Sequence, residues 1–380
     1  MQTVAAFHGG RSFEAIGEDF KTLERSAAVI RADVLDAWFE PSPNVLNTLH
    51  EFLPFLVKSS PPVHGTGLVE AISRIRGIPR ECVLIGGGSS DLIFTCLPRI
   101  VVASHRVMIL DPMYGEYRHV FERVIGSEIC PAPLEESRDF RVDTDELIEF
   151  ALRANPRFIA IVNPNSPTGQ FWPRGELLRF LDALPETTSL LVDETYIEYV
   201  GIEESVEQEA ARRPNLFVLK SMSKVSALSG MRVGYLVGSA ASIQKLARWM
   251  PPWAVSLPAQ VAAVEALGDP EYYRARYRET HALRETLAAD LRSFETVRVF
   301  PSCANFILVK VPENSDEVCE RMAESNVYVR DCDSMGSKMQ HRFLRISVRG
   351  PGENMQIGAV LLEALCELGG SVRHGASLCG

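Results

Sequence analysis

SMSKVSALSGMR, residues 221–232, is the segment from which the rest of the sequence is best understood. The apolar run Leu216-Phe217-Val218-Leu219 leads into it and predicts a buried strand. Such a strand would deliver Lys224 to the carboxyl edge of a sheet, and ligands bind at that edge in open α/β sheets. The sequence therefore places a lysine amine at a predicted ligand site.

Two serines and one arginine surround this lysine. Ser221 and Ser223 precede it closely, and Arg232 follows eight residues later. Hydroxyl groups and a forked guanidinium suit a phosphate dianion, because they bind it through charge-assisted hydrogen bonds. An amine beside a phosphate site indicates an aldehyde cofactor that carries a phosphate and is held as a Schiff base. The alternative is an exposed lysine in a serine-rich loop, with Arg232 in a surface ion pair.

The Ser-x-Ser-Lys motif, followed by Gly-Met-Arg-Val-Gly-Tyr at residues 230–235, resembles the lysine loop of fold-type-I pyridoxal-phosphate enzymes of aminotransferase class I and II. It is most similar to the histidinol-phosphate aminotransferase branch, which includes the threonine-phosphate decarboxylases. The resemblance extends over nearly the whole chain through ordered motifs. It implies pyridoxal 5'-phosphate (PLP) as the cofactor, attached at Lys224 and held by Ser221, Ser223 and Arg232.

The same resemblance implies an α/β fold in two domains. A large domain would hold a mostly parallel seven-stranded sheet sandwiched by helices, and a smaller α/β domain would follow at the C-terminus. The predicted boundaries are residues 1–45 for an N-terminal arm and part of the small domain, 46–265 for the large PLP-binding domain, and 266–380 for the small domain.

The composition limits the classes of protein to consider. A chain of 380 residues is long enough for two substantial cores, and 46% hydrophobic residues are ordinary for a soluble enzyme. The net charge of −10 argues against nucleic acid or anionic membranes as the main partner. Neither a long apolar run nor a basic start followed by an apolar core occurs, so we expect no transmembrane helix, no secretory signal and a cytoplasmic location.

The cysteines and histidines give no sign of a metal. The 8 cysteines form no C-x-x-C pair, and the 8 histidines form no H-E-x-x-H motif. This pattern suits a reduced compartment and argues against a disulfide framework or a zinc ribbon. We expect no metal at the site.

A second phosphate contact is predicted after the strand at residues 83–85, where three glycines lead to Ser89 and Ser90. The free amides and the dipole of a helix N-terminus favour an anion. Ser89 and Ser90 are therefore cofactor candidates. By resemblance, Tyr114, which follows the strand at residues 107–110, stacks on the cofactor ring.

The strand at residues 189–192 ends in Asp193, which the sequence predicts to be buried. A buried carboxylate needs a cationic partner, and a protonated pyridine nitrogen supplies one. Asp193 would keep that nitrogen protonated, so that the ring acts as an electron sink. By resemblance, Tyr196 donates a hydrogen bond to the phenolic oxygen of the cofactor. Lys224, Asp193 and Tyr196 are the predicted catalytic set.

The loop at residues 163–169 departs from the family pattern. Relatives carry an asparagine before Pro-Thr-Gly that binds the phenolic oxygen, and this chain has Ser166 there. Ser166 can still donate a hydrogen bond, and Asn163 or Asn165 could do so instead.

The substrate site is predicted from FLRISVRG at residues 343–350. Arg345 lies on a strand between apolar neighbours and points away from them, and it matches the family arginine that binds the substrate α-carboxylate. A surface ion pair is the alternative. Arg349 would face the same side and bind a second anion, provided that the strand continues so far. By resemblance, His8 and Trp38 also border the substrate, and Trp38 stands where relatives carry a polar residue.

The resemblance also implies a homodimer that acts on a small molecule. In relatives a tyrosine crosses the dimer interface to the neighbouring cofactor phosphate. Its place falls on Ser60 here, and His64 is the alternative.

The leading prediction for function is a PLP-dependent aminotransferase that acts on an amino acid or an amino-acid-derived metabolite. If the Cα–H bond breaks, the freed Lys224 moves the proton and the outcome is transamination. If the carboxylate is held perpendicular to the ring, CO2 leaves instead. The alternatives are a decarboxylase resembling the threonine-phosphate enzymes, a cyclisation or β/γ-replacement enzyme, and a non-catalytic protein on the same fold. The presence of Lys224, Asp193 and Arg232 disfavours the last of these.

Overall fold

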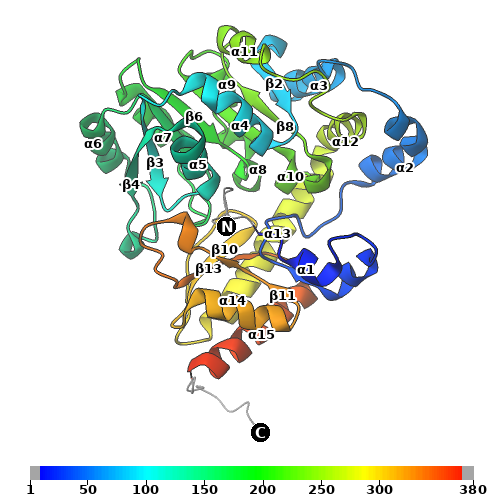
Figure 1. Ribbon diagram of the computed structural model, residues 1–380, viewed down its shortest axis with the longest axis vertical. Helices are drawn as coiled ribbons and strands as arrows, with labels where there is room; N and C mark the ends of the chain where they lie inside the picture. Colours follow the sequence, from blue (N-terminus) through cyan, green and yellow to red (C-terminus); the bar gives the residue numbers. More distant parts are fainter. Residues whose placement is uncertain (1–8, 370–380) are drawn as a thin grey trace.

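The computed structural model describes residues 9–369 and arranges them in two α/β domains, with the large domain uppermost in Figure 1. The large domain is built on a seven-stranded sheet of order β2-β8-β7-β6-β5-β3-β4. Strand β8 is antiparallel to both neighbours, and the other pairs are parallel. The strands are β2 (Val83–Gly86), β3 (Arg106–Asp111), β4 (Glu128–Pro133), β5 (Phe158–Val162), β6 (Ser189–Asp193), β7 (Leu216–Ser221) and β8 (Gly234–Val237). The predicted mostly parallel sheet is confirmed.

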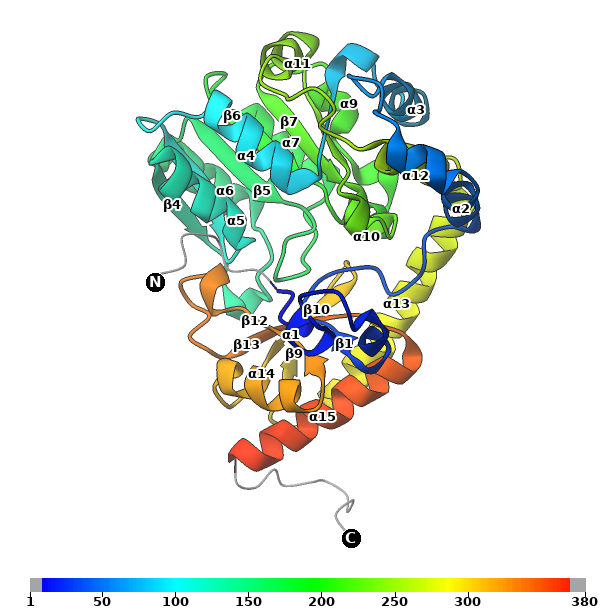
Figure 2. The same ribbon diagram turned by 45° about the vertical axis from the view of Figure 1, so that its right-hand side comes forward.

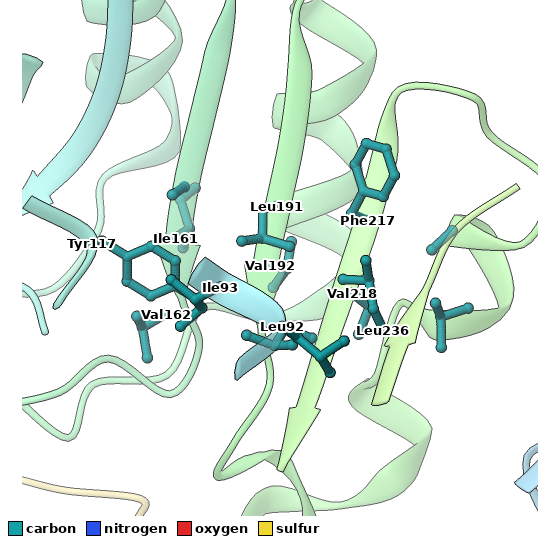
Figure 3. Packing of buried hydrophobic residues seen from close by; sticks show 14 of the residues in the cluster. Leu92, Ile93, Tyr117, Ile161, Val162, Leu191, Val192, Phe217, Val218 and Leu236 are labelled. Atoms are coloured by element: carbon teal, nitrogen blue, oxygen red, sulfur yellow. The ribbon is translucent and has the colours of Figure 1, made fainter. Parts of the chain in front are cut away.

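The central strands are apolar along their whole length because helices cover both faces of the sheet. All residues of β5 and β7 are buried, so both faces of these strands lie in the core. Figure 3 shows side chains of β5, β6, β7 and β8 packed with Leu92 and Ile93 of α4 and with Tyr117 of α5. This packing makes the sheet a rigid base for the residues at its carboxyl edge.

The crossover helices of the large domain follow the strands closely. They are α2 (Pro43–Lys58), α3 (Thr66–Arg76), α4 (Ser89–Ile100), α5 (Gly115–His119), α6 (Thr144–Ala154), α7 (Arg174–Ala183), α8 (Ile197–Val200), α9 (Glu207–Ala210), α10 (Met222–Val225), α11 (Ala240–Ala247) and α12 (Leu257–Leu267). A π-helical turn at Val120–Ile125 and short 3-10 turns at Arg80–Cys82, Glu136–Arg138, Ile202–Glu204 and Ser229–Met231 complete this part of the chain.

The small domain is built on an antiparallel sheet of order β12-β13-β10-β9. Its strands are β9 (Arg298–Val299), β10 (Phe306–Lys310), β12 (Arg330–Asp331) and β13 (Phe343–Ser347). Helices α14 (Ser315–Glu324) and α15 (Pro351–Gly369) contact each other beside this sheet, and a 3-10 turn spans Asp333–Met335.

The N-terminal arm and one long helix join the two domains. The arm holds α1 (Ser12–Ile16), a 3-10 turn (Leu23–Ala28) and β1 (Ile30–Arg31), and β1 pairs in parallel with β11 (Val327–Tyr328). Helix α13 (Pro270–Arg292), yellow in Figure 2, runs from the large domain into the small one. The predicted domain boundaries stay predictions. Across residues 9–369, no helix has the length and apolar character that a membrane crossing requires.

Candidate active site

A cavity of about 260 Å³ lies at the carboxyl edge of the large sheet, between the two domains. Most of the predicted site residues line it: Ser89, Ser90, Tyr114, Ser166, Asp193, Tyr196, Ser221, Ser223, Lys224, Arg232 and Arg345. Gly9, Asp33, Val34, Leu35, Val162 and Thr195 complete the lining. His8 lies outside the described residues. Residues from distant parts of the chain thus meet at one edge of the sheet.

Lys224 projects from α10, directly after the buried strand β7. Its Nζ atom lies 2.8 Å from Oδ1 of Asp36, in the arm. Burial lowers the pKa of Lys224, and the Asp36 carboxylate opposes that shift. Burial raises the pKa of Asp36, but Lys224, Ser229 and Arg31 together outweigh this effect, and the pKa falls to about 2. The lysine is therefore a half-buried amine with one close carboxylate.

One end of the cavity is rich in hydrogen-bond donors. Helix α4 begins at Ser89, and the amides of its first turn have no partner within the helix. Arg232 lies beside this turn, because a Cβ atom on Gly88 would be 2.6 Å from its Nη2 atom. The Nη1 atom of Arg232 is 3.4 Å from the Ser223 hydroxyl, and Ser221 lies on the same side of the lysine. This donor set fits a phosphate dianion.

Asp193, which is 3% exposed, also lines the cavity. Its Oδ2 atom accepts a hydrogen bond of 2.8 Å from the Tyr117 hydroxyl. Its Oδ1 atom accepts bonds from the amide and the hydroxyl of Thr195, at 3.0 and 2.6 Å. Burial raises the pKa of Asp193, and these hydrogen bonds oppose the shift. Because the three donors are neutral, the carboxylate fits a cationic ring nitrogen.

Two tyrosines flank the middle of the cavity. The Tyr114 hydroxyl donates to Oε2 of the buried Glu116 at 2.6 Å, and Ser90 donates to the same oxygen. The Tyr196 ring packs edge-on against Phe306 of the small domain, with ring centres 5.2 Å apart. Burial raises the pKa of Tyr196, so its hydroxyl stays protonated and can donate.

Of the three candidates in the loop at residues 163–169, only Ser166 borders the cavity. Asn163 exchanges two hydrogen bonds with the backbone of Trp172. The Asn165 amide donates to Pro112 O and to the Thr168 hydroxyl. The prediction that Asn165 contacts the cofactor is therefore not supported, because its amide nitrogen holds the loop together.

Arg345 is the cation that the small domain contributes to the cavity. Strand β13 presents it, and its Nη1 and Nη2 atoms donate to Ser166 Oγ at 3.0 Å and Asp33 O at 3.1 Å. Its Nε atom is buried and has no hydrogen-bond partner among residues 9–369. A buried guanidinium with unused donor capacity suits a carboxylate ligand.

The structure does not bear out the shared face of Arg345 and Arg349, because β13 ends at Ser347. Arg349 donates to the backbone carbonyl of Asp36 at 3.2 Å and does not line the cavity. Trp38 is also turned away, since its indole N–H donates to Thr280 on α13 at 2.9 Å. Both hydrogen bonds hold the arm that carries Asp36 in place.

Ser60 and His64, the two residues predicted to cross a dimer interface, do not lie at the lysine cavity. Ser60 and His64 are exposed, and His64 lines a separate cavity of about 590 Å³ next to β2. Neither residue borders the lysine cavity of its own chain.

Sequence reasoning missed three contacts of the site: Asp36, Tyr117 and Thr195. Thr195 follows Asp193 by two residues, a spacing typical of a local turn that caps the carboxylate. Tyr117 lies one helical turn after Tyr114, and that spacing also marks it. Asp36 has no such signal, because its partner is 188 residues away.

Comparison with known proteins gives consistent results. The profile of the family "Aminotransferase class I and II" matches residues 56–362. The histidinol-phosphate aminotransferase of Desulfitobacterium hafniense (strain DSM 10664 / DCB-2) is 35% identical over 301 residues, which cover 78% of this chain and 81% of that protein.

Two solved structures show the same fold. Histidinol-phosphate aminotransferase from Sinorhizobium meliloti, in complex with pyridoxal-5'-phosphate, aligns with a TM-score of 0.82 at 24% identity and covers 91% of this chain and 94% of that one. L-threonine-O-3-phosphate decarboxylase from Porphyromonas gingivalis aligns with a TM-score of 0.77 at 22% identity, over 89% of this chain and 100% of that one.

Proposed function

Because the chain belongs to the aminotransferases of class I and II, and is thus a PLP-dependent aminotransferase, we propose that Lys224 is the residue that binds the cofactor covalently. The observation that carries this proposal is the position of its amine. Lys224 lines one cavity together with the phosphate-type donors and Asp193.

The residues of the cavity fit PLP at both ends. The amides at the start of α4, the serines at positions 89, 221 and 223, and Arg232 would hold the phosphate. Asp193 would hold the proton on the ring nitrogen, and Tyr196 and Ser166 would donate to the phenolic oxygen. The Tyr114 ring would cover the cofactor ring. When bound, the cofactor supplies an electron sink that weakens the bonds to the substrate Cα.

Arg345 defines the class of substrate. Its guanidinium lies in the lysine cavity and reaches Ser166 at the same time. An amino acid that offers its α-carboxylate to Arg345 would present its Cα toward Lys224. The freed Lys224 amine would then remove the Cα proton, and transfer of that proton gives transamination. We therefore propose an amino acid or an amino-acid-derived metabolite with a free carboxylate as the substrate.

Helix α2 supports the proposal of a homodimer. Its buried side, which includes Val45 and Leu56, packs against α12. The flanks of that buried side expose Phe52 and Phe55, which are 47% and 55% exposed, together with Leu46, Leu53 and Val57. A cluster of exposed apolar side chains on one helix marks an interaction surface, and a second copy of the chain would cover it.

The proposed role of Lys224 is tested by the Lys224→Arg variant, which keeps the positive charge beside Asp36 but cannot form the covalent link. The wild type should take up PLP, develop a visible absorption band and show the cofactor mass on the Lys224 peptide after borohydride reduction. Lys224→Arg should show neither signal. Lys220→Arg serves as the control, because Lys220 pairs with Glu198 outside the cavity and the adduct should persist. An adduct retained in Lys224→Arg would refute the proposal.

A further inference from the structure

Helix α10, which carries Lys224, cannot satisfy its own backbone. It has only four residues, and the last four carbonyl groups of any helix lack partners within that helix. The chain then turns sharply at Ala227, whose φ of 55° is left-handed. The carbonyl groups that follow the lysine therefore need donors from elsewhere in the molecule.

Three tyrosine hydroxyls supply these donors to three consecutive residues. Tyr199 donates to Lys224 O at 3.1 Å and Tyr277 donates to Val225 O at 2.9 Å. Tyr273 donates to Ser226 O at 3.3 Å. We call Tyr199, Tyr273 and Tyr277 the tyrosine ladder. The hydroxyls reach the lysine turn through its backbone carbonyl groups, so the ladder fixes the path of the turn through hydrogen bonds that do not involve the lysine side chain.

The ladder is a rigid group. Tyr273 and Tyr277 lie one turn apart on α13 and so project side by side. The ring centres of Tyr199 and Tyr277 are 4.9 Å apart, and the Phe39 ring packs on Tyr273 and Tyr277 of α13. Phe39 follows Asp36 by three residues. The arm that carries the carboxylate partner of Lys224 is therefore anchored on the same helix as the turn that carries Lys224.

The same helix also reaches the substrate side of the site. His281 contacts Tyr199 O through Nε2 at 2.7 Å, and its Nδ1 atom lies 2.8 Å from Nη1 of Arg284. Arg284 in turn donates to Ala304 O in the small domain at 3.1 Å. Burial and the neighbouring Arg284 lower the pKa of His281, so the neutral ring can donate from Nε2 and accept at Nδ1. These contacts end at Ala304, two residues before Phe306. The guanidinium of Arg345 lies over the Phe306 ring.

We propose that Tyr199, Tyr273 and Tyr277 are positioning residues for Lys224, and that α13 thereby sets the lysine relative to Arg345. The inference rests on the proposed role of Lys224 as the cofactor attachment point. A covalent reaction requires the amine to approach the aldehyde carbon at the correct distance and angle. A loosened turn would spend less time in that arrangement, although the phosphate site would be unchanged.

The experiment measures capture of PLP by the apoprotein, with the visible band as signal, over a range of PLP concentrations. The half-saturating concentration reports the phosphate site, and the limiting rate reports the covalent step. In a Tyr199→Phe/Tyr277→Phe double variant, which keeps both rings, the limiting rate should fall about tenfold because each lost hydroxyl contact is worth a few-fold. The half-saturating concentration should stay within about twofold. Amide exchange in residues 222–227 should rise together with the loss of rate.

Tyr272→Phe is the matched control. It lies on the same helix and also loses a hydroxyl bond to a backbone carbonyl, that of Glu40, yet it does not touch the lysine turn. Its capture kinetics should equal those of the wild type. If the double variant fails to fold, Tyr277→Phe alone gives the same comparison with a smaller change.

Three results would contradict the inference. The first is a limiting rate equal to that of Tyr272→Phe, and the second is faster amide exchange without any loss of rate. The third is a raised half-saturating concentration with an unchanged limiting rate, which would assign the ladder to the phosphate site. Failure of the wild type itself to capture PLP would refute the proposed function instead.

Discussion

The pair formed by Lys224 and Asp36 determines the charge of the amine before the cofactor arrives. Two effects compete at this amine, since burial favours the neutral form and the carboxylate at 2.8 Å favours the ammonium. Burial is the larger effect, so the pKa of Lys224 lies below its ordinary value. Because only a neutral amine attacks an aldehyde, the balance sets the pH at which the enzyme accepts PLP.

Asp36→Asn should lower the pKa of Lys224 further, because it removes the opposing carboxylate. The neutral amine would then be available at lower pH, and the pH profile of PLP capture should shift to lower pH by about one unit or more. At a pH on the rising part of the profile, capture should be about tenfold faster than in the wild type. Stopped-flow absorbance from pH 6 to 10 is the measurement.

Asp33→Asn provides the comparison for this prediction. Asp33 lines the same cavity but accepts its hydrogen bond from the amide of Gly10, in the arm. The Asp33→Asn variant tests whether the loss of any negative charge at the cavity shifts the pH profile of PLP capture. Equal shifts in the two variants would show that the specific contact of Asp36 is unimportant.

The turn before α4 requires a backbone conformation at Gly88 that residues other than glycine rarely adopt. Gly88 has a φ of 97°, which L-residues rarely adopt, and its missing side chain leaves room for Arg232. Gly88→Ala should strain the turn and displace the guanidinium from the phosphate site. The affinity for PLP should fall about tenfold or more, because a charge-assisted contact is lost. Gly230→Ala, where nothing lies within 4 Å, should bind PLP normally. Equal affinity for PLP in the two variants would contradict this account.

Elements with a strong local signal could be predicted from the sequence. The strands at residues 158–162, 189–193 and 216–221 are mostly apolar runs, and each ends at or shortly before a polar residue that lines the cavity. The end of β13 could not be predicted, because the apolar alternation continues through Val348 while pairing with β10 stops at Ser347. For the same reason Arg349 was expected in a pocket that it does not line.

The sequence alone does not predict the contacts of Trp38 and Phe39 either. The resemblance places Trp38 at the substrate side. The partners of these two residues, Thr280 on one hand and Tyr273 and Tyr277 on the other, lie on a helix more than 200 residues away. Only the three-dimensional arrangement shows that these aromatic rings anchor the arm to α13.

At the scale of the whole molecule, the exposed apolar side of α2 predicts self-association. A Phe52→Glu/Phe55→Glu double variant should weaken the proposed dimer more than a hundredfold, since burying each phenylalanine contributes about 1.5–3 kcal/mol. Sedimentation velocity should show a dimer for the wild type and a monomer for the variant at the same micromolar concentration. Because both side chains are exposed in the single chain, the monomer should stay folded.

Leu152→Glu is the control for this prediction. Leu152 is 51% exposed on α6, at the opposite side of the large domain from α2 in Figure 1. This variant should sediment as the wild type does. A wild type that is monomeric under these conditions, or a double variant that remains dimeric, would remove the support for the α2 interface.

The antiparallel strand β8 has a consequence for the order in which the protein is made. Gly86 pairs with Gly234, so the glycine turn before α4 and the lysine turn meet only after about 150 further residues have left the ribosome. At usual rates of synthesis this takes about 7 to 30 s. Ile30 pairs with Val327, which is synthesised later still. The first third of the nascent chain therefore holds an incomplete sheet with β2 unpaired, and the cofactor can bind only after most of the polypeptide has been translated.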